Sequence, residues 1–189
     1  MRLKPGSYLI LGMLQRGVRT GYAIKRTVDR STSFFWAASL AQVYPDLAAL
    51  EEGGYVVSAD EPRGRRPRKA YRLTDRGDEA LAEWLRSERQ PHFEWRDEEL
   101  LRLFFADAVP LEDALELVVR ARERAEEAAR TFRSDVLPLA QAAAGRFPSI
   151  VAREGADYFT WRADWFRGIE TELRRALASA APSASNAAP

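Results

Sequence analysis

The stretch SLAQVYPDLAALEEGG, residues 39–54, decides the fold that this sequence predicts. Ser39 is a residue type that begins helices, and the pair Gly53-Gly54 is typical of a helix end. Between these limits apolar residues recur at steps of three and four, which predicts one buried face: Leu40, Val43 or Tyr44, Leu47 and Leu50. The stretch is therefore expected to form an amphipathic helix.

The opposite face of this helix carries short polar side chains near its start. Ser39, Gln42 and Asp46 are of the kind that reach base edges when the end of a helix enters a major groove. Pro45 lacks the N–H that would pair with the carbonyl of residue 41, so either the helix starts nearer Gln42 or its first turn is irregular. A core helix with a polar outer face is the alternative, and this segment alone does not decide between the two.

A basic hairpin is predicted directly after this helix. The runs YVVSAD (55–60) and KAYRLT (69–74) indicate two short strands, and the segment between them contains Pro and Gly. From Glu61 to Arg72 six basic residues stand against one acid: Arg63, Arg65, Arg66, Arg68, Lys69 and Arg72. Such a density builds a positive potential suited to phosphates. A solvated charged loop is the alternative, but the order of helix, helix end and basic hairpin favours a recognition helix and its wing.

Three further helices complete the predicted N-terminal half. They are expected from Pro5 to Leu14, from Gly21 to Asp29 after a Thr20 cap, and from Thr74 to about Ser87. Two groups of apolar side chains are expected to be buried, the first under the recognition helix: Phe34, Phe35 and Trp36, and Ala80, Leu81, Trp84 and Leu85. The fold class predicted is mainly α with a small β-hairpin wing, a winged helix-turn-helix.

The second half of the chain is predicted to be helical throughout. ERQPHFEWRDEE (88–99) breaks the periodicity and is the expected joint, after which helices are expected at Glu98–Ala106, Leu111–Val136 and Pro148–Ala178. We expect a DNA-binding domain over residues 1–90, an antiparallel, coiled-coil-like dimerisation domain over 91–180, and a disordered tail over 181–189, which is small, polar and Pro-containing.

Apolar stripes on the two long helices predict an interface. One stripe has small residues at its middle, which allow close helix approach: Leu111, Leu115, Val118, Ala121 or Arg122, Ala125, Ala129 and Phe132. The other is wide and aromatic: Tyr158, Trp161, Trp165, Ile169, Leu173 and Leu177. The two helices could close on each other within one chain. Burial against a second copy is favoured, because the N-terminal domain has too little surface to cover both, and a homodimer is therefore expected.

Charge is divided unequally between the halves. The net charge of +1 arises from 16 basic and 11 acidic residues in 1–90 and 13 basic and 17 acidic residues in 91–189. The positive half suits a polyanion such as double-stranded DNA, and the negative half is expected to face away from it.

Composition argues against other classes of protein. The chain has no cysteine and one histidine, His92, so no metal site or cofactor is expected. It has no Gly-rich phosphate loop and no nucleophile elbow. Adjacent carboxylates such as Glu98-Glu99 and Glu126-Glu127 are interpreted as part of solvated helix faces. We therefore expect that the protein is not an enzyme. Without a membrane-spanning apolar run or a signal-peptide cleavage site, a cytoplasmic protein is expected.

Several motifs together resemble the winged-helix domain of the PadR family of bacterial transcriptional regulators. They are Gly21-Tyr22, Gln42-Val43-Tyr44-Pro45, Leu50-Glu51, and Pro67-Arg68-Lys69 leading into Tyr71-Arg72-Leu73-Thr74. The resemblance covers residues 7 to about 86, and the second half resembles the variable C-terminal domain of the family in length and pattern only. Ala48-Ala49 stand where family members often have a bulkier charged pair, which leaves fewer phosphate contacts to be expected here.

The resemblance implies a homodimeric repressor that binds a pseudo-palindromic operator. Ser39 and Gln42 are the candidates for base contact and Tyr44 for a base or a phosphate, while the family places Tyr22 and Lys25 close to the DNA backbone. The cations of the wing are the candidates for phosphates or the minor groove: Arg63, Arg65, Arg66, Arg68 and Lys69. A winged-helix module that binds only other proteins is the alternative.

Aromatic residues near the joint and in the last helix raise the question of a small-molecule effector. They are His92, Phe93, Trp95, Tyr158, Trp161 and Trp165. In relatives that sense drugs or phenolic acids, aromatic side chains between the two domains form the ligand site, so the resemblance implies a site for an apolar or aromatic effector. The alternative is that these residues pack in a core or a dimer interface, which is usual for a tryptophan stripe at helical spacing.

Overall fold

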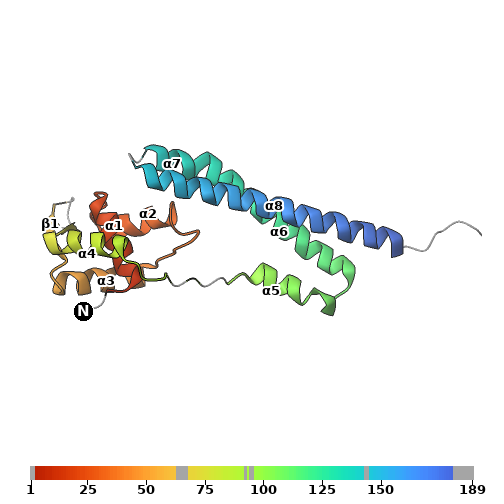
Figure 1. The fold of residues 1–189 in the computed structure, drawn as a ribbon, viewed down its shortest axis with the longest axis horizontal. Coiled ribbons are helices and arrows are strands. Elements are labelled where there is room, and N and C mark those ends of the chain that lie inside the picture. The colour runs from red at the N-terminus through yellow and green to blue at the C-terminus, as the bar shows by residue number, and fades with distance from the viewer. Residues whose placement is uncertain (1–2, 63–67, 92, 94–95, 143–144, 181–189) are drawn as a thin grey trace, which may run out of the picture. The chain divides into compact units, whose positions relative to one another are not determined.

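A computed structural model describes residues 3–62, 68–91, 93, 96–142 and 145–180 of the chain. The chain divides into two compact units, Met1–His92 and Phe93–Pro189 (Figure 1). We call these the N-terminal unit and the helical unit. Five candidate site residues lie outside the described residues, as does the tail 181–189 for which disorder was predicted: Arg63, Arg65, Arg66, His92 and Trp95.

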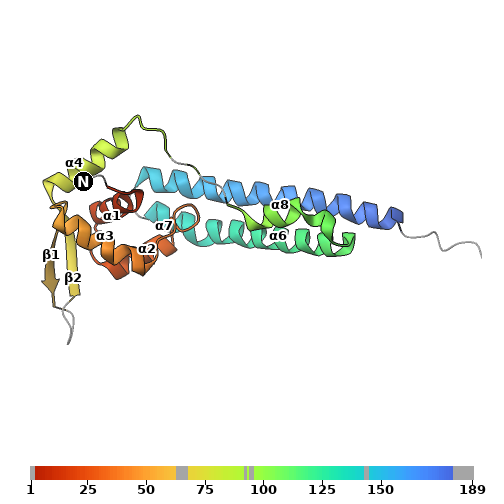
Figure 2. The ribbon, with the colours of Figure 1, turned by 90° about the horizontal axis from the view of Figure 1, so that it is seen from below.

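The described part of the N-terminal unit contains four helices and the two strands of a hairpin (Figure 2). The elements are α1 (Pro5–Gln15), α2 (Gly21–Asp29), α3 (Leu40–Glu52), β1 (Val56–Glu61), β2 (Arg68–Leu73) and α4 (Asp75–Arg86). Two threonine caps predicted from the sequence are confirmed: Thr20 Oγ1 accepts from the N–H of Ala23, and Thr74 Oγ1 accepts from that of Gly77, both at 3.2 Å. Because a capped start satisfies an otherwise unpaired N–H, these two helices begin where the sequence predicts.

The hairpin is antiparallel and is tied to the helices by its backbone. Val56 pairs with Leu73 and Glu61 with Arg68, and the chain connects the two strands after the Glu61–Arg68 pair. The N–H of Tyr71 donates to the carbonyl of Arg19 at 2.7 Å, which links β2 to the connection between α1 and α2. The predicted strands are confirmed, except that Tyr55 lies just before β1.

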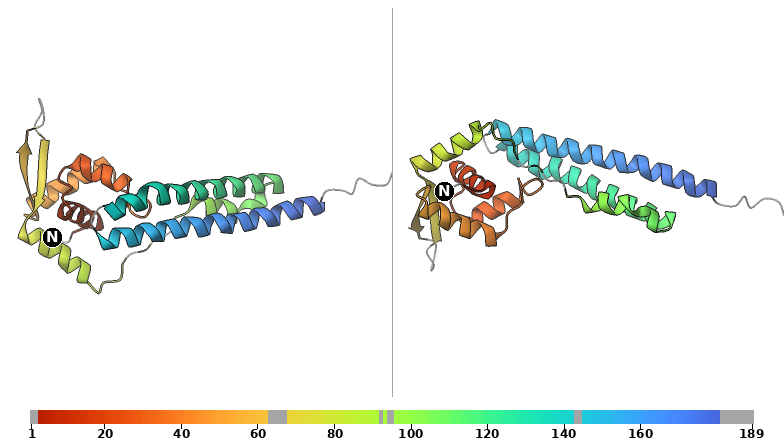
Figure 3. Two further views of the ribbon diagram at one scale, coloured as in Figure 1. Left: turned by 90° about the horizontal axis from the view of Figure 1, so that it is seen from above. Right: turned by 60° about the horizontal axis from the view of Figure 1, so that its bottom comes forward.

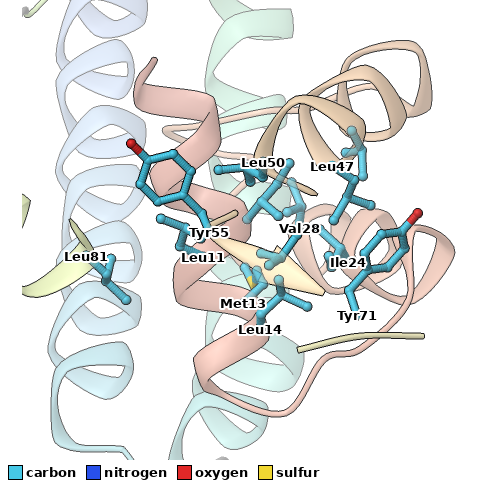
Figure 4. Packing of buried hydrophobic residues seen from close by; sticks show 13 residues of the cluster. Leu11, Met13, Leu14, Ile24, Val28, Leu47, Leu50, Tyr55, Tyr71 and Leu81 are labelled. Carbon is cyan, nitrogen blue, oxygen red and sulfur yellow. The ribbon is translucent and has the colours of Figure 1, made fainter. Parts of the chain in front are cut away.

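A single apolar cluster holds the N-terminal unit together, with the hydroxyls of Tyr55 and Tyr71 turned outward (Figure 4). Its most deeply buried members come from four elements: Leu11, Ile24, Val28, Leu47 and Val56. On α3 the buried face contains Val43 and not Tyr44, and Leu40, predicted to be buried, is 40% exposed. The helix begins at Leu40 with Pro45 inside it, so the later start near Gln42 is excluded.

Two predictions of burial in this unit were wrong. Phe34, Phe35 and Trp36 remain exposed in the turn between α2 and α3, because α1 and α2 already cover the apolar face of α3. Leu85 is 67% exposed, and Trp84 reaches the core only by stacking on Tyr8, with ring centroids 4.8 Å apart. Leu81 is buried as predicted.

The helical unit is built on two long helices that pack antiparallel (Figure 3). Its elements are α5 (Glu98–Phe104), a 3-10 turn η1 (Ala106–Ala108), α6 (Leu111–Thr131), a π-helical turn η2 (Phe132–Val136), α7 (Leu137–Ala142) and α8 (Arg146–Ala180). Small buried side chains on α6 allow α8 to approach closely: Ala114, Ala121, Ala125 and Ala129. The two long helices therefore close on each other within one chain, whereas the sequence pattern favoured their burial against a second copy.

The π-helical turn has an identifiable cause. Pro138 has no N–H to donate to the carbonyl of Ser134, and its ring would collide with that carbonyl in a regular α-helix. The chain widens by one residue instead, and the N–H of Leu137 donates to the carbonyl of Phe132, five residues back. This turn presses the Phe132 ring against Gly155 of α8, where a Cβ atom would lie 2.2 Å from the ring.

The buried face of α8 differs from the predicted one. Residues that meet α6 and α7 include Ala152, Gly155, Ala156, Ala163 and Phe166. Ile169 and Leu173 pack there as predicted, but Trp161 is 55% exposed and Trp165 39% exposed, on another side of the helix. Alanine and glycine allow two helices to approach more closely than indole rings do, so the small-residue side is buried. In the part of the chain that is described, no helix is long and apolar enough to cross a membrane.

Candidate nucleic-acid interface

The start of α3 presents two linked polar side chains. Ser39 and Gln42 form a capping box, in which the Gln42 Oε1 atom accepts from the N–H of Ser39 at 3.0 Å and from its hydroxyl at 3.2 Å. Both residues are exposed. The two candidates for base contact are therefore hydrogen-bond partners of each other before any DNA is bound.

Two tyrosines flank the same end of α3. Tyr44 is 50% exposed and Tyr22, at the start of α2, is 61% exposed. A Cβ atom at Gly21 would lie 2.7 Å from the Tyr44 ring, so the ring fits here because residue 21 has no side chain. Lys25, the other candidate on α2, is ion-paired with Asp29 one turn later.

Glu51 connects the end of α3 to both strands of the hairpin. Its carboxylate accepts from the Ser58 hydroxyl of β1 at 2.5 Å and lies 3.6 Å from the Lys69 ammonium of β2. The Ser58 hydrogen bond and the charge of Lys69 lower the pKa of Glu51, while desolvation opposes them. A carboxylate in the last turn of a helix opposes the helix dipole, so Glu51 is explained better by its hairpin partners than by helix stability. We call this group the α3–hairpin brace.

Two of the predicted phosphate-binding cations, Arg68 and Lys69 of β2, are already paired within the chain. Arg68 donates to Glu61 at 2.8 Å across the strand register, and Lys69 faces Glu51. The sequence count of six cations against one acid included Glu61 but missed Glu51, which precedes the hairpin by several residues. Arg63, Arg65 and Arg66 lie outside the described residues, and Arg72 is exposed on β2.

Three of the six candidate effector residues lie together on α8. The ring centroids of Tyr158 and Trp161 are 6.1 Å apart, and those of Trp161 and Trp165 are 6.5 Å apart. An open groove of 620 Å³ beside them is lined by Ile150, Arg153, Glu154, Asp157, Tyr158 and Trp161. Phe93 is 82% exposed in the segment before α5. Among the described residues no group of three or more His, Asp and Glu side chains is arranged to hold a metal ion.

A buried arginine beside this stripe was not found by sequence reasoning. Arg162 donates to Glu99 at 2.9 Å, lies 2.6 Å from the Asp97 carboxylate, and stacks over Phe166. Asp97 in turn caps α5 by accepting from the N–H groups of Glu99 and Leu100. Asp97 and Glu99, at the end of the joint, are thereby anchored to α8. No local sequence pattern indicates this link, because Arg162 is distant from both residues in sequence.

The interpretation of two glutamates as solvated also needs correction. Glu99 pairs with Arg162 and Arg124, and Glu126 accepts from Arg122 and Arg167, both at 2.8 Å. These pairs connect α8 to α5 and α6, so the carboxylates of Glu99 and Glu126 hold helices together. Their neighbours Glu98 and Glu127 stay exposed.

Known proteins match both units of the chain. Residues 10–83 match the model of the transcriptional regulator PadR-like family, and residues 95–174 match that of the virulence activator alpha C-term family. The negative transcriptional regulator PadR of Bacillus subtilis strain 168 is 31% identical over 111 residues, which span 58% of this chain and 61% of that relative, less than two thirds of its length.

Solved structures share the fold over nearly the whole chain. The crystal structure of Bacillus subtilis PadR in complex with operator DNA has a TM-score of 0.82 at 22% identity and covers 92% of this chain and 99% of that one. The structure of the same protein with p-coumaric acid has a TM-score of 0.72 at 22% identity, with coverage of 92% and 99%.

The fold and the exposed polar start of α3 together define a winged helix-turn-helix protein. In it α3 is the helix that follows the turn, and β1–β2 form the wing. The two family models match consecutive parts of the chain, and the first of them agrees with the motifs around Gln42 and Tyr71. Residues 10–83 thus match the PadR-like family of transcriptional regulators, and the chain is similar to Bacillus subtilis PadR in sequence and in fold.

Proposed function

We propose that this chain is a sequence-specific DNA-binding regulator that acts as a homodimeric repressor. The observation that carries the proposal is the combination of an exposed, polar start of α3 with a basic hairpin braced to the end of the same helix. A helix of this kind can enter a major groove while the wing follows the phosphate backbone. Such a role belongs in the cytoplasm and uses binding groups only, with no catalytic residue.

In this proposal the candidate residues divide into two groups. Gln42 and Tyr44 face bases, whereas Tyr22 and the cations of the wing face phosphates, which supply affinity without sequence information. Lys25, Arg68 and Lys69 are ion-paired in the free protein and would exchange carboxylate partners for phosphates on binding. The net affinity that these three cations add is therefore expected to be smaller than that of a cation with no carboxylate partner in the free protein.

Dimerisation through the helical unit is supported by the large apolar side chains that this unit leaves exposed. They are Leu101 (58%), Phe104 (78%), Phe105 (61%), Trp161 (55%) and Trp165 (39%). Soluble monomers rarely expose so many large apolar groups, and burial against a second copy removes them from water. A two-fold dimer presents two α3 helices to successive turns of the major groove, about 34–36 Å apart, as a pseudo-palindromic operator requires.

An aromatic effector is the last part of the proposal. Tyr158, Trp161 and Trp165 offer ring faces beside an open groove, and Bacillus subtilis PadR was crystallised with p-coumaric acid. We infer a site for a small aromatic or apolar molecule along this stripe, and His92, Phe93 and Trp95 remain candidates from the sequence. Titration with p-coumaric acid should quench tryptophan fluorescence and release DNA in the wild type, and Trp161→Ala should weaken both responses. DNA release that is unchanged in Trp161→Ala would contradict this assignment.

DNA binding is tested by fluorescence anisotropy with a duplex from the chain's own upstream intergenic region and a scrambled duplex, each at two salt concentrations. We expect clear preference for the native duplex. Gln42→Ala should cost about 1–3 kcal/mol at one base position, whereas Gln141→Ala, the same change at an exposed position of α7, should cost nothing. Arg66→Ala should weaken binding to every sequence and lower the salt slope by about one. Equal, weak binding to both duplexes would favour the protein-interaction alternative.

Dimerisation is tested by sedimentation velocity. Phe104→Asp adds a charge to the exposed apolar surface of the helical unit and should shift the protein to monomers, with loss of affinity for the palindromic duplex. Leu85→Asp changes another exposed apolar residue, which belongs to the N-terminal unit; it is the control and should remain dimeric. A Phe104→Asp variant that still sediments as a dimer would refute this surface as the interface.

A further inference from the structure

The capping box of α3 fixes the orientation of the Gln42 side-chain amide. A backbone N–H can only donate, so the Gln42 atom that faces the N–H of Ser39 at 3.0 Å must be the carbonyl oxygen. The Ser39 hydroxyl donates to the same oxygen at 3.2 Å. The Oε1 atom has two lone pairs, and these two bonds use both of them.

What remains free on Gln42 is the amide nitrogen with its two hydrogens. The side chain is exposed at the start of α3, whereas Val43, Leu47 and Leu50 of the same helix are buried. In this state Gln42 can donate hydrogen bonds to a partner but can accept none. Its chemistry toward DNA therefore differs from that of an unconstrained glutamine, which donates and accepts together.

Major-groove edges distinguish these two states of glutamine. Guanine presents two acceptors, N7 and O6, and thymine presents the acceptor O4, whereas adenine presents an acceptor beside a donor and cytosine presents a donor. The usual bidentate contact of glutamine with adenine needs Oε1 to accept from the adenine amino group. With both lone pairs of Oε1 used by Ser39, that second bond forms only if at least one of the two Ser39 bonds is broken, which weakens the cap of α3.

We propose that Gln42 reads its base as a donor only, and that Ser39, by holding the Gln42 oxygen, directs it to the acceptor edge of guanine or thymine and away from adenine. Ser39, predicted from the sequence to contact a base itself, is in this proposal a positioning residue that acts through Gln42. The inference rests on the proposed DNA-binding function and deepens it by naming the base chemistry that α3 selects.

The test is a panel of operator duplexes in which each base pair of one half-site is replaced in turn by the other three. The position whose preference disappears in Gln42→Ala is the one that Gln42 reads. In the wild type, guanine or thymine should be bound best there. Replacement of a guanine at this position by 7-deazaguanine should weaken binding about three- to tenfold, because one acceptor is lost.

Variants of Ser39 separate positioning from mere support of the helix. Ser39→Ala keeps the backbone N–H but frees one lone pair of Oε1, so the penalty for adenine at this position should fall about three- to tenfold relative to guanine. Ser39→Thr keeps the hydroxyl and should keep the wild-type preference. A purely structural role of Ser39 would lower affinity for all four bases equally, and that result would overturn the proposal.

Failure of the inference is distinguishable from failure of the proposed function. If the wild type does not prefer the operator over the scrambled duplex, the function and the inference both fall. If it does, but adenine is the preferred base at the Gln42 position, only the inference is overturned. The inference also fails if Gln42→Ala leaves all base preferences unchanged.

Discussion

Gly155→Ala should destabilise the protein although the same change usually stabilises a helix. The added Cβ atom would lie 2.2 Å from Phe132 Cε1, while ordinary contact begins at 3.4 Å. The Phe132 ring is only 3% exposed and rests against Phe159 with centroids 5.5 Å apart, so it has little room to retreat. Overpacking of a core costs about 1–3 kcal/mol, and this overlap belongs at the upper end of that range.

Gly168→Ala is a matched control on the same helix. Nothing lies within 4 Å of a Cβ atom at that position. Alanine is favoured over glycine inside a helix by about 1 kcal/mol, and this gain applies at both positions. Gly168→Ala should therefore be about 1 kcal/mol more stable than the wild type and Gly155→Ala about 2 kcal/mol less stable, so their difference isolates the overpacking cost.

The two variants should be compared with the wild type by urea unfolding of the full chain. Protein concentration must be the same in each series, because association shifts apparent stability. Thermal midpoints should follow with changes of about 2–4 °C per kcal/mol for a chain of this size. Equal stabilisation of both variants would refute the tight contact between Phe132 and Gly155, and with it the account of the π-helical turn as the element that presses them together.

Three further predictions concern other parts of the chain. Gly21→Ala should leave the unfolding free energy nearly unchanged but displace the half-exposed Tyr44 ring, so it should weaken operator affinity in anisotropy titrations; unchanged affinity would remove Tyr44 from the interface. Arg162→Met should cost about 2–3 kcal/mol in urea unfolding, because it leaves two partly buried carboxylates without their cation, and a neutral result would contradict this. The hydrogen bond from Arg122 lowers the pKa of Glu126 from 4.5, so the ionised carboxylate stabilises the folded protein fully above pH 4.5, and this stabilisation is lost as the pH falls below 4.5. Glu126→Gln should therefore make the free energy of unfolding depend less on pH in acid. An unaltered dependence would refute this role.

Elements of the N-terminal unit could be predicted because their signals are local. A threonine before α2, another before α4 and the glycines after α3 each fix a boundary within a few residues of sequence. Periodicity alone could not choose between Val43 and Tyr44 on α3, since both fit the spacing. The choice depends on α2, where Gly21 leaves space beside the Tyr44 ring at the surface.

The helical unit shows why an apolar stripe does not identify its own partner. Aromatic residues suggested the buried face of α8, but close approach of η2 and α7 selected the stripe that contains Ala152, Gly155 and Ala156. Sequence reasoning gave weight to hydrophobicity and too little to side-chain size. The aromatic stripe, left exposed within one chain, is instead the surface on which the proposed dimer and effector depend.

Charged contacts were the least predictable part of the site. Arg162 and Glu99 are 63 positions apart in sequence, and nothing local distinguishes this arginine from the exposed ones around it. By contrast, the pairing of Arg68 with Glu61 follows from the hairpin register and could have been derived once the strands were aligned. The count of wing cations therefore overstated the charge that is available to DNA.

The α3–hairpin brace limits how the contacts within one operator half-site can be spaced. Glu51 holds Ser58 and Lys69 while the Tyr71 N–H is bound to the Arg19 carbonyl, so hairpin and recognition helix move as one body. In the proposed complex with DNA, the base contacts of α3 and the backbone contacts of β1–β2 would therefore keep a fixed spacing. Inserting one base pair within a half-site should weaken binding, because it lengthens the DNA by about 3.4 Å while the α3–hairpin brace keeps the helix and the wing at one spacing.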